Sequence, residues 1–81
     1  MISAYIFFTV KLGKTDDVVK QLREIPQVTR VAVVTGTWDI VARIAVSDLK
    51  ELYEITTKAI HMIEGIEETQ TAVIETELVN E

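Results

Sequence analysis

The sequence predicts an α+β fold of the ferredoxin-like type, in which a β-α-β-β-α-β chain forms a four-stranded antiparallel sheet with two helices on one face. Three observations support this fold. Apolar residues recur at every second position at the start of the chain, two further strand-like runs flank a short turn with a glycine, and segments of helical periodicity separate the strands. With 81 residues, the chain is expected to form a single domain over residues 1–81.

The first strand is expected over residues 2–12, where the even positions are apolar and many residues are β-branched or aromatic. Gly13 interrupts this pattern. Thr15 then offers a hydroxyl as the N-cap of a helix. Asp16 and Asp17 lie in the first turn of that helix, where the helix dipole favours negative charge.

The first helix is expected to end before Pro26, because a proline disfavours helical backbone at the residue that precedes it. The second and third strands are expected over residues 28–35 and 39–46, which are both rich in β-branched residues. Residues 36–38 connect them, and a connection this short makes the two strands an antiparallel hairpin.

A second, longer helix is expected to begin at a cap formed by Ser47 or Asp48 and to run to about Glu64. Gly65 supplies a stop at its C-terminal end. Residues 69–78 form the last predicted strand, although their alternation is less regular than in the first strand.

The second face of the predicted sheet is unusually apolar. A face that contacts water should carry mainly polar residues, but the odd positions of these strands also hold large apolar side chains. Contiguous apolar patches usually mark interfaces, so we expect the sheets of two chains to pack against each other in a dimer. The alternative is scattered surface apolar residues. The residues expected at the dimer interface are Tyr5, Phe7, Val31, Val33 and Val41.

The composition narrows the class of function. The absence of cysteine excludes disulfides, thiolate zinc sites and cysteine nucleophiles. Eight Lys and Arg residues against 13 Asp and Glu residues give a net charge of −5, which disfavours direct binding of nucleic acid. The apolar start of the chain resembles neither a signal peptide nor a membrane helix, so we expect a cytoplasmic protein.

Residues suited to catalysis are scarce. The single histidine, His61, is placed by helical spacing on the solvent side of the second helix, opposite Leu52. No second His or Cys accompanies it, so no metal site is expected. The carboxylates are dispersed, and we interpret them as a solvated face and tail. We therefore expect no enzymatic activity, no catalytic residue and no cofactor.

The hairpin segment Thr35-Gly36-Thr37-Trp38-Asp39 is the most distinctive candidate for binding. Gly36 can adopt a positive φ and leave backbone amides pointing at a ligand carboxylate, while Asp39 offers an anion to an ammonium group. The alternative interpretation is an ordinary hairpin turn, in which Asp39 is a local acceptor and Trp38 packs at an interface.

Two patterns in this order carry a resemblance to a known family: T-G-x-x-D at Thr35–Asp39, and I-x-G-I-x-x-T-x-T at Ile63–Thr71. The surrounding segments also match, from the strand AYIFFTVKLGK through the helix TDDVVKQLREIPQV and VAVVTGTWDIVARIAVSD to LKELYEITTKAIHMIEGIEETQTAVI. Together they resemble the ligand-binding RAM domain (regulation of amino-acid metabolism) of the Lrp/AsnC transcriptional regulators.

The resemblance implies a domain that dimerises through its sheet and assembles into rings, commonly octamers, with amino acids or related metabolites bound where dimers meet. By residue match, the ligand-binding residues implied are Thr35, Gly36, Thr37, Trp38, Asp39, Thr69, Gln70 and Thr71. Trp38 is bulkier than the small or tyrosine residues expected at its position. It either lines the pocket or packs at an interface.

Full-length regulators of this family carry an N-terminal helix-turn-helix domain, whereas this chain begins at the first strand, so the resemblance implies a stand-alone RAM protein. The favoured function is an amino-acid-binding oligomer linked to transcriptional regulation. A second hypothesis is an assembly protein that joins full-length Lrp/AsnC regulators in rings without binding a ligand. A third is a small ferredoxin-like enzyme, such as a monooxygenase or isomerase, which is disfavoured because His61 faces outward.

Overall fold

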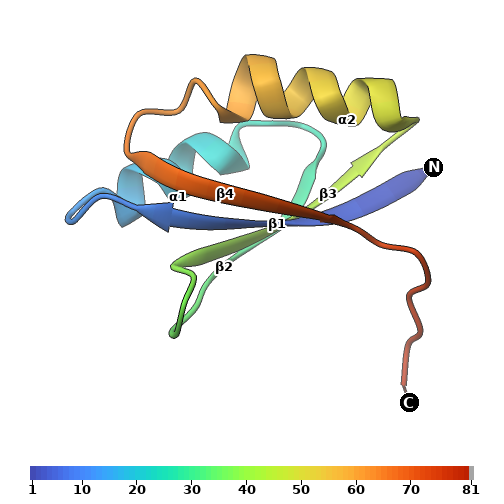
Figure 1. Cartoon of the computed structure of the whole chain (residues 1–81), viewed down its shortest axis with the longest axis horizontal. Coiled ribbons are helices and arrows are strands. Elements are labelled where there is room, and N and C mark those ends of the chain that lie inside the picture. Colours follow the sequence, from blue (N-terminus) through green and yellow to red (C-terminus); the bar gives the residue numbers. More distant parts are fainter. Residues whose placement is uncertain (81) are drawn as a thin grey trace.

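The computed structural model describes residues 1–80 and confirms the predicted order of elements and the four-stranded antiparallel sheet. The elements are β1 (Ile2–Val10), α1 (Thr15–Arg23), β2 (Val28–Val33), β3 (Ile40–Val46), α2 (Leu49–Ile55), the π-helical turn η1 (Thr56–Ile60) and β4 (Ile66–Val73). The strands lie in the order β2-β3-β1-β4, and both helices lie on one side of the sheet (Figure 1).

The core lies between the sheet and the helices, and the central strands β1 and β3 supply most of it. Their even positions point to the helices because successive side chains of a strand alternate between its two faces. Phe8 and Ile40, for example, are Cα partners and are both fully buried. Helix α1 contributes Val18 and Leu22 to the same layer. The alternation predicted for the first strand therefore identifies its core face.

The two helix starts differ in how they are capped. Asp48 is the N-cap of α2, as predicted, and its Oδ1 accepts a hydrogen bond of 2.8 Å from the backbone N–H of Glu51. The prediction that Thr15 caps α1 is wrong. Lys14 occupies the N-cap position, no side chain caps the helix, and Thr15 is its first helical residue. Asp16 does lie in the first turn as expected.

The second helix is interrupted by an extra residue that the periodicity did not reveal. Helix α2 gives way to η1, in which the backbone N–H of His61 donates to the carbonyl of Thr56, five residues earlier, at 2.9 Å. A π-helical turn rotates the positions after it relative to those before it. Ile60 is consequently 1% exposed, whereas Leu49 at the start of α2 is 58% exposed.

The face of Val31 and Val33 differs from the prediction. These two residues of β2 pair with Ala42 and Ile40 of β3, which are fully buried on the helix side of the sheet. Cross-strand partners share a face, so the expectation that these valines lie on the opposite face is wrong. A register shift at Thr29 is the cause, because one additional residue in a strand exchanges the faces of all residues that follow.

The face of the sheet away from the helices, which we call the open face, carries Tyr5, Phe7, Ala32, Val41, Arg43, Gln70 and Ala72. The last strand ends at Val73, five residues earlier than predicted, and the chain then leaves the sheet on this side (Figure 1). No helix in residues 1–80 combines the length and apolarity that crossing a membrane requires.

Candidate functional site

The hairpin between β2 and β3 is fastened to the end of β1 by Asp39. The carboxylate Oδ2 of Asp39 accepts a hydrogen bond of 2.9 Å from the backbone N–H of Val10. The backbone N–H of Asp39 donates to the carbonyl of Phe8, also at 2.9 Å. Its own carbonyl accepts from the N–H of Val34, also at 2.9 Å. Asp39 therefore closes the base of the hairpin, which matches the alternative interpretation of this residue as a local acceptor.

The tip of the hairpin is exposed, whereas its base is bonded to β1 through Asp39. Thr35, Gly36 and Thr37 are all exposed. Gly36 has a φ of +106°, so the positive φ expected for this glycine is confirmed. No atom outside the hairpin's own neighbouring residues lies within 4 Å of the place where a Cβ would stand, so only the backbone conformation favours glycine there. The tip is free to meet a ligand or a second chain.

Trp38 lies against the open face. Its indole is 5.8 Å from the ring of Phe7, centroid to centroid, at an angle of 43°, and the residue is half-buried. Phe7 pairs with Val41 on the open face, so the indole extends the apolar surface of the sheet toward the hairpin. Within one chain, Trp38 packs on the surface predicted to meet a partner.

The second group of predicted site residues lies on the other side of β1. Thr69 pairs with Phe8, which in turn pairs with Ile40 of β3, so one strand separates Thr69 from the hairpin base. Two strand spacings correspond to about 10 Å. Gln70 shares the open face with Phe7, whereas Thr69 and Thr71 project from the opposite face. The two groups therefore lie in one part of the sheet and are separated by β1.

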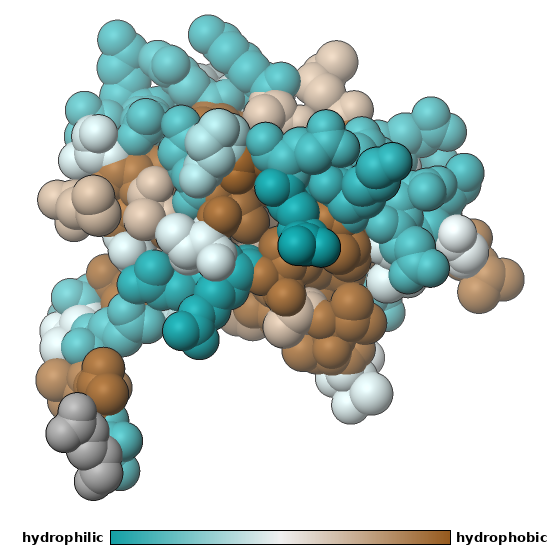
Figure 2. Space-filling model, turned by 180° about the vertical axis from the view of Figure 1, so that it is seen from behind, coloured by the Kyte–Doolittle hydropathy of each residue, from teal (hydrophilic) through white to brown (hydrophobic). Residues whose placement is uncertain are grey.

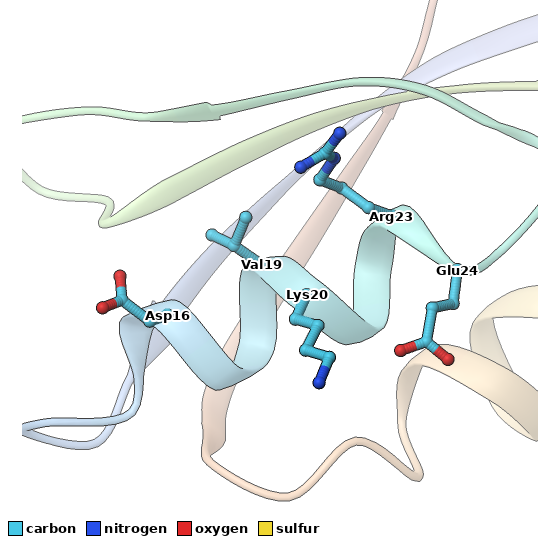
Figure 3. Close-up of a pocket in the computed structure, with 5 residues that line it drawn as sticks. All are labelled: Asp16, Val19, Lys20, Arg23 and Glu24. Atoms are coloured by element: carbon cyan, nitrogen blue, oxygen red, sulfur yellow. The ribbon is translucent and has the colours of Figure 1, made fainter.

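Helix α1 carries a surface depression away from the hairpin tip. It is lined by Asp16, Val19, Lys20, Arg23 and Glu24. All five come from α1 and the residue after it, and their side chains diverge (Figure 3). These side chains therefore do not converge on one point where a ligand could bind. No group of three His, Asp or Glu residues within residues 1–80 is arranged to hold a metal ion.

A polar cluster on the open face was missed by the sequence prediction. The carboxylate of Glu77, in the C-terminal tail, bridges two neighbouring strands: its Oε1 is 2.7 Å from Nη2 of Arg43, and its Oε2 accepts from the hydroxyl of Tyr5 at 3.1 Å. Arg43 and Tyr5 are Cα partners on β3 and β1. The hydrogen bonds from Arg43 and then Tyr5 hold the pKa of Glu77 below its ordinary value of 4.5.

Sequence alone gave no signal for this cluster. Residues 69–78 were predicted as one strand, which would have placed Glu77 in a ladder rather than across the sheet. The strand ends at Val73, and the chain makes one more backbone bond, from the N–H of Ile74 to the carbonyl of Ser3 at 2.9 Å, before it turns.

The remaining apolar residues of the predicted dimer interface lie together. Tyr5 and Val41 join Phe7 on the open face, with Tyr5 36% exposed and the others half-buried. From the side opposite to that of Figure 1, apolar atoms gather over the hairpin end of β2 and β3 and again near the tip of the tail (Figure 2). His61 is exposed, as predicted from helical spacing.

The domain is thus a ferredoxin-like α+β domain with an exposed hairpin that is anchored to β1. The sequence model of the Lrp/AsnC ligand binding domain matches residues 3–81. The chain therefore belongs to this family, as the T-G-x-x-D and I-x-G-I-x-x-T-x-T patterns indicated.

Individual relatives agree with this assignment. An uncharacterized HTH-type transcriptional regulator of Pyrococcus horikoshii is 33% identical over 73 residues, which cover 90% of this chain and 46% of the regulator. A solved structure from Thermus thermophilus superimposes with a TM-score of 0.91 at 30% identity, and the match covers 99% of this chain and 100% of that one.

A transcriptional regulator of Neisseria meningitidis, solved as a complex with L-Met, shares the fold with a TM-score of 0.89 at 17% identity; the match covers 98% of this chain and 53% of that one. The chain thus spans about half the length of the curated relative from Pyrococcus.

Proposed function

We propose that this chain is a cytoplasmic, oligomeric effector-binding module linked to transcriptional regulation, that its ligand is an amino acid or a related metabolite, and that it acts neither as an enzyme nor as a direct binder of nucleic acid. Its family membership supports a regulatory role, and a structural neighbour was solved with L-Met. The observation that carries the proposal for this chain is the hairpin: an exposed tip with a positive-φ glycine, on a base fixed by three hydrogen bonds of Asp39.

The binding site we propose is completed by a second dimer. Thr35, Gly36 and Thr37 are exposed, and one strand separates the hairpin base from Thr69. Three surface depressions of residues 1–80 are lined by other residues, on α1, beside the C-terminal tail and along β2. A ring of dimers, such as an octamer, would bring another chain against the tip and enclose a small zwitterion. Backbone amides near Gly36 would meet its carboxylate, and carboxylates would meet its ammonium group.

The dimer we propose packs the open faces of two chains together through Tyr5, Phe7 and Val41, with Trp38 at the edge. Two sheets stacked face to face lie about 10 Å apart and fill the space between them with side chains. The large rings on this face suit that arrangement, since aromatic residues are enriched at interface cores.

The test is isothermal titration of the twenty amino acids and common keto acids, combined with sedimentation equilibrium. We expect heat from at least one ligand, and a threonine-to-valine change at Thr37 to weaken that binding at least tenfold. The same change at Thr57, in η1 away from the hairpin, is the matched control and should leave binding unchanged. Flat titrations for every ligand would contradict the effector proposal, and a monomer at micromolar concentration would contradict the dimer.

A second candidate function is assembly without a ligand, in which the chain enters rings with a full-length Lrp/AsnC regulator. The observation that favours it is the exposed hairpin tip, which leaves Thr35, Gly36 and Thr37 accessible to a second chain. Co-purification with a helix-turn-helix regulator of the same family, together with flat titrations, is the result expected for this alternative.

A further inference from the structure

The C-terminal tail is attached to the open face by Glu77 before it extends away from the sheet. It leaves β4 next to Ser3 of β1, and Glu77 reaches Arg43 on β3 and Tyr5 on β1. The side chains of Arg43 and Glu77 are 24% and 40% exposed. Figure 1 shows the rest of the tail extending away from the sheet, on the side opposite the helices.

The two residues that follow Glu77 are apolar and almost fully exposed to solvent. Leu78 is 87% exposed and Val79 is 85% exposed. With Glu77, they line a groove of about 460 Å³ together with residues of the sheet: Tyr5, Thr29, Arg30 and Arg43. Leu78 and Val79 contribute little hydrophobic stabilisation to their own chain, because their apolar surface stays in contact with water.

The groove is also unbalanced in charge. Two guanidinium groups, from Arg30 and Arg43, line it with the single carboxylate of Glu77. Within residues 1–80, the one ion pair joins Arg43 to Glu77, and Arg30 is a second cation beside the same carboxylate. What fits the groove is therefore apolar and carries a negative charge, and the tail of another copy has this composition, with Glu75 close to Leu78 and Val79.

We propose that residues 74–80 are a dimerisation arm: Glu77 fixes the arm on its own sheet, and Leu78 and Val79 contact the open face and groove of a second copy of this chain. This inference rests on the proposed dimer through the open face. The layer between two stacked sheets is about 10 Å deep, and the arm occupies part of that layer, so a second copy on this face meets the arm. In a two-fold dimer the contact occurs twice, once for each arm.

The experiment is sedimentation equilibrium of the full 81-residue chain, with the double variant Leu78→Ser, Val79→Ser. Both residues are exposed, so the variant keeps its fold, which circular dichroism checks. We expect the Kd of dimerisation to rise at least tenfold. Leu12→Ser is the matched control, because Leu12 is equally apolar and fully exposed but lies in the turn after β1; its Kd should stay within twofold of the parent.

A second measurement reports the contact itself. In a mixture of isotope-labelled and unlabelled chains, intermolecular NOEs from the methyl groups of Leu78 to the partner are expected. A parent dimer whose Kd is unchanged in the double variant, and which gives no such NOEs, would overturn the arm and leave the proposed function intact. A parent chain that stays monomeric would overturn the dimer and the arm together.

Discussion

At the scale of single residues, Asp39 has a structural role that a motif alone does not reveal. Its carboxylate Oδ2 accepts a hydrogen bond from the backbone N–H of Val10. We predict that Asp39→Ala lowers the free energy of unfolding by about 1.5–3 kcal/mol, the usual contribution of a hydrogen bond to a charged group. Urea unfolding followed by circular dichroism measures it.

Asp39→Asn is the control for this prediction, because its amide oxygen can still accept from Val10 while its charge is gone. It should recover most of the lost stability. If Asn also weakens effector binding, the charge of Asp39 acts on the ligand; equal instability of the Ala and Asn variants would contradict the hydrogen-bond explanation.

Glu77 makes the tail anchor dependent on pH. Arg43 and Tyr5 lower its pKa in the folded chain below 4.5, so the anchored form is favoured while Glu77 is ionised. The stabilisation is therefore complete above pH 4.5 and is lost as the pH falls below that value through the folded pKa. Arg43 keeps its charge over this range, since Glu77 raises its pKa further.

The measurement for Glu77 is the heteronuclear NOE of the Leu78 amide from about pH 7 to about pH 3, a range that spans the ordinary carboxyl pKa. We expect the tail to be ordered at neutral pH and to lose order below pH 4.5. Glu77→Gln should give low values at every pH, and a parent chain with a pH-independent NOE would contradict the anchor.

At the scale of elements, substitutions at two glycines with nearly the same φ distinguish the cost of backbone strain from the cost of a packing clash. Gly65 has φ +104°, and an added Cβ would stand 2.9 Å from the Cβ of Lys14 and 3.2 Å from Cγ2 of Val18; Gly36 has φ +106° and nothing within 4 Å. We predict that Gly36→Ala costs about 1–2 kcal/mol from backbone strain alone, and that Gly65→Ala costs more because α1 must also move. Thermal and urea unfolding of both variants test this; equal losses would contradict the packing contribution.

The elements that were predicted well have strong periodicity, and two of the errors arise where a segment contains one extra residue. The first strand, the hairpin and the Asp48 cap follow from local chemistry. The register shift at Thr29 and the π-helical turn at Thr56 do not, because one extra residue leaves the overall composition of the segment nearly unchanged. The register shift alone accounts for the wrong face of Val31 and Val33.

At the scale of the whole molecule, the fold and the family could be predicted from the sequence, whereas the site could be predicted only in part. The order of elements follows from periodicity, and right-handed crossovers then fix the layers. The hairpin was recognised from its residues, but the three hydrogen bonds of Asp39 depend on where β1 ends. The path of the tail depends on Glu77 meeting two strands, and local sequence carries no signal for such a long-range contact.

The end of β1 joins two loops that are far apart in sequence. Val10 holds the hairpin through Asp39, and the N–H of the next residue, Lys11, donates to the carbonyl of Gly65 at 2.8 Å, in the turn that leads into β4. Hydrogen bonds of two consecutive peptide units thus join the hairpin base to the turn before β4, the strand that carries Thr69 to Thr71. The two halves of the predicted site share the end of β1 as a common support, although they do not touch.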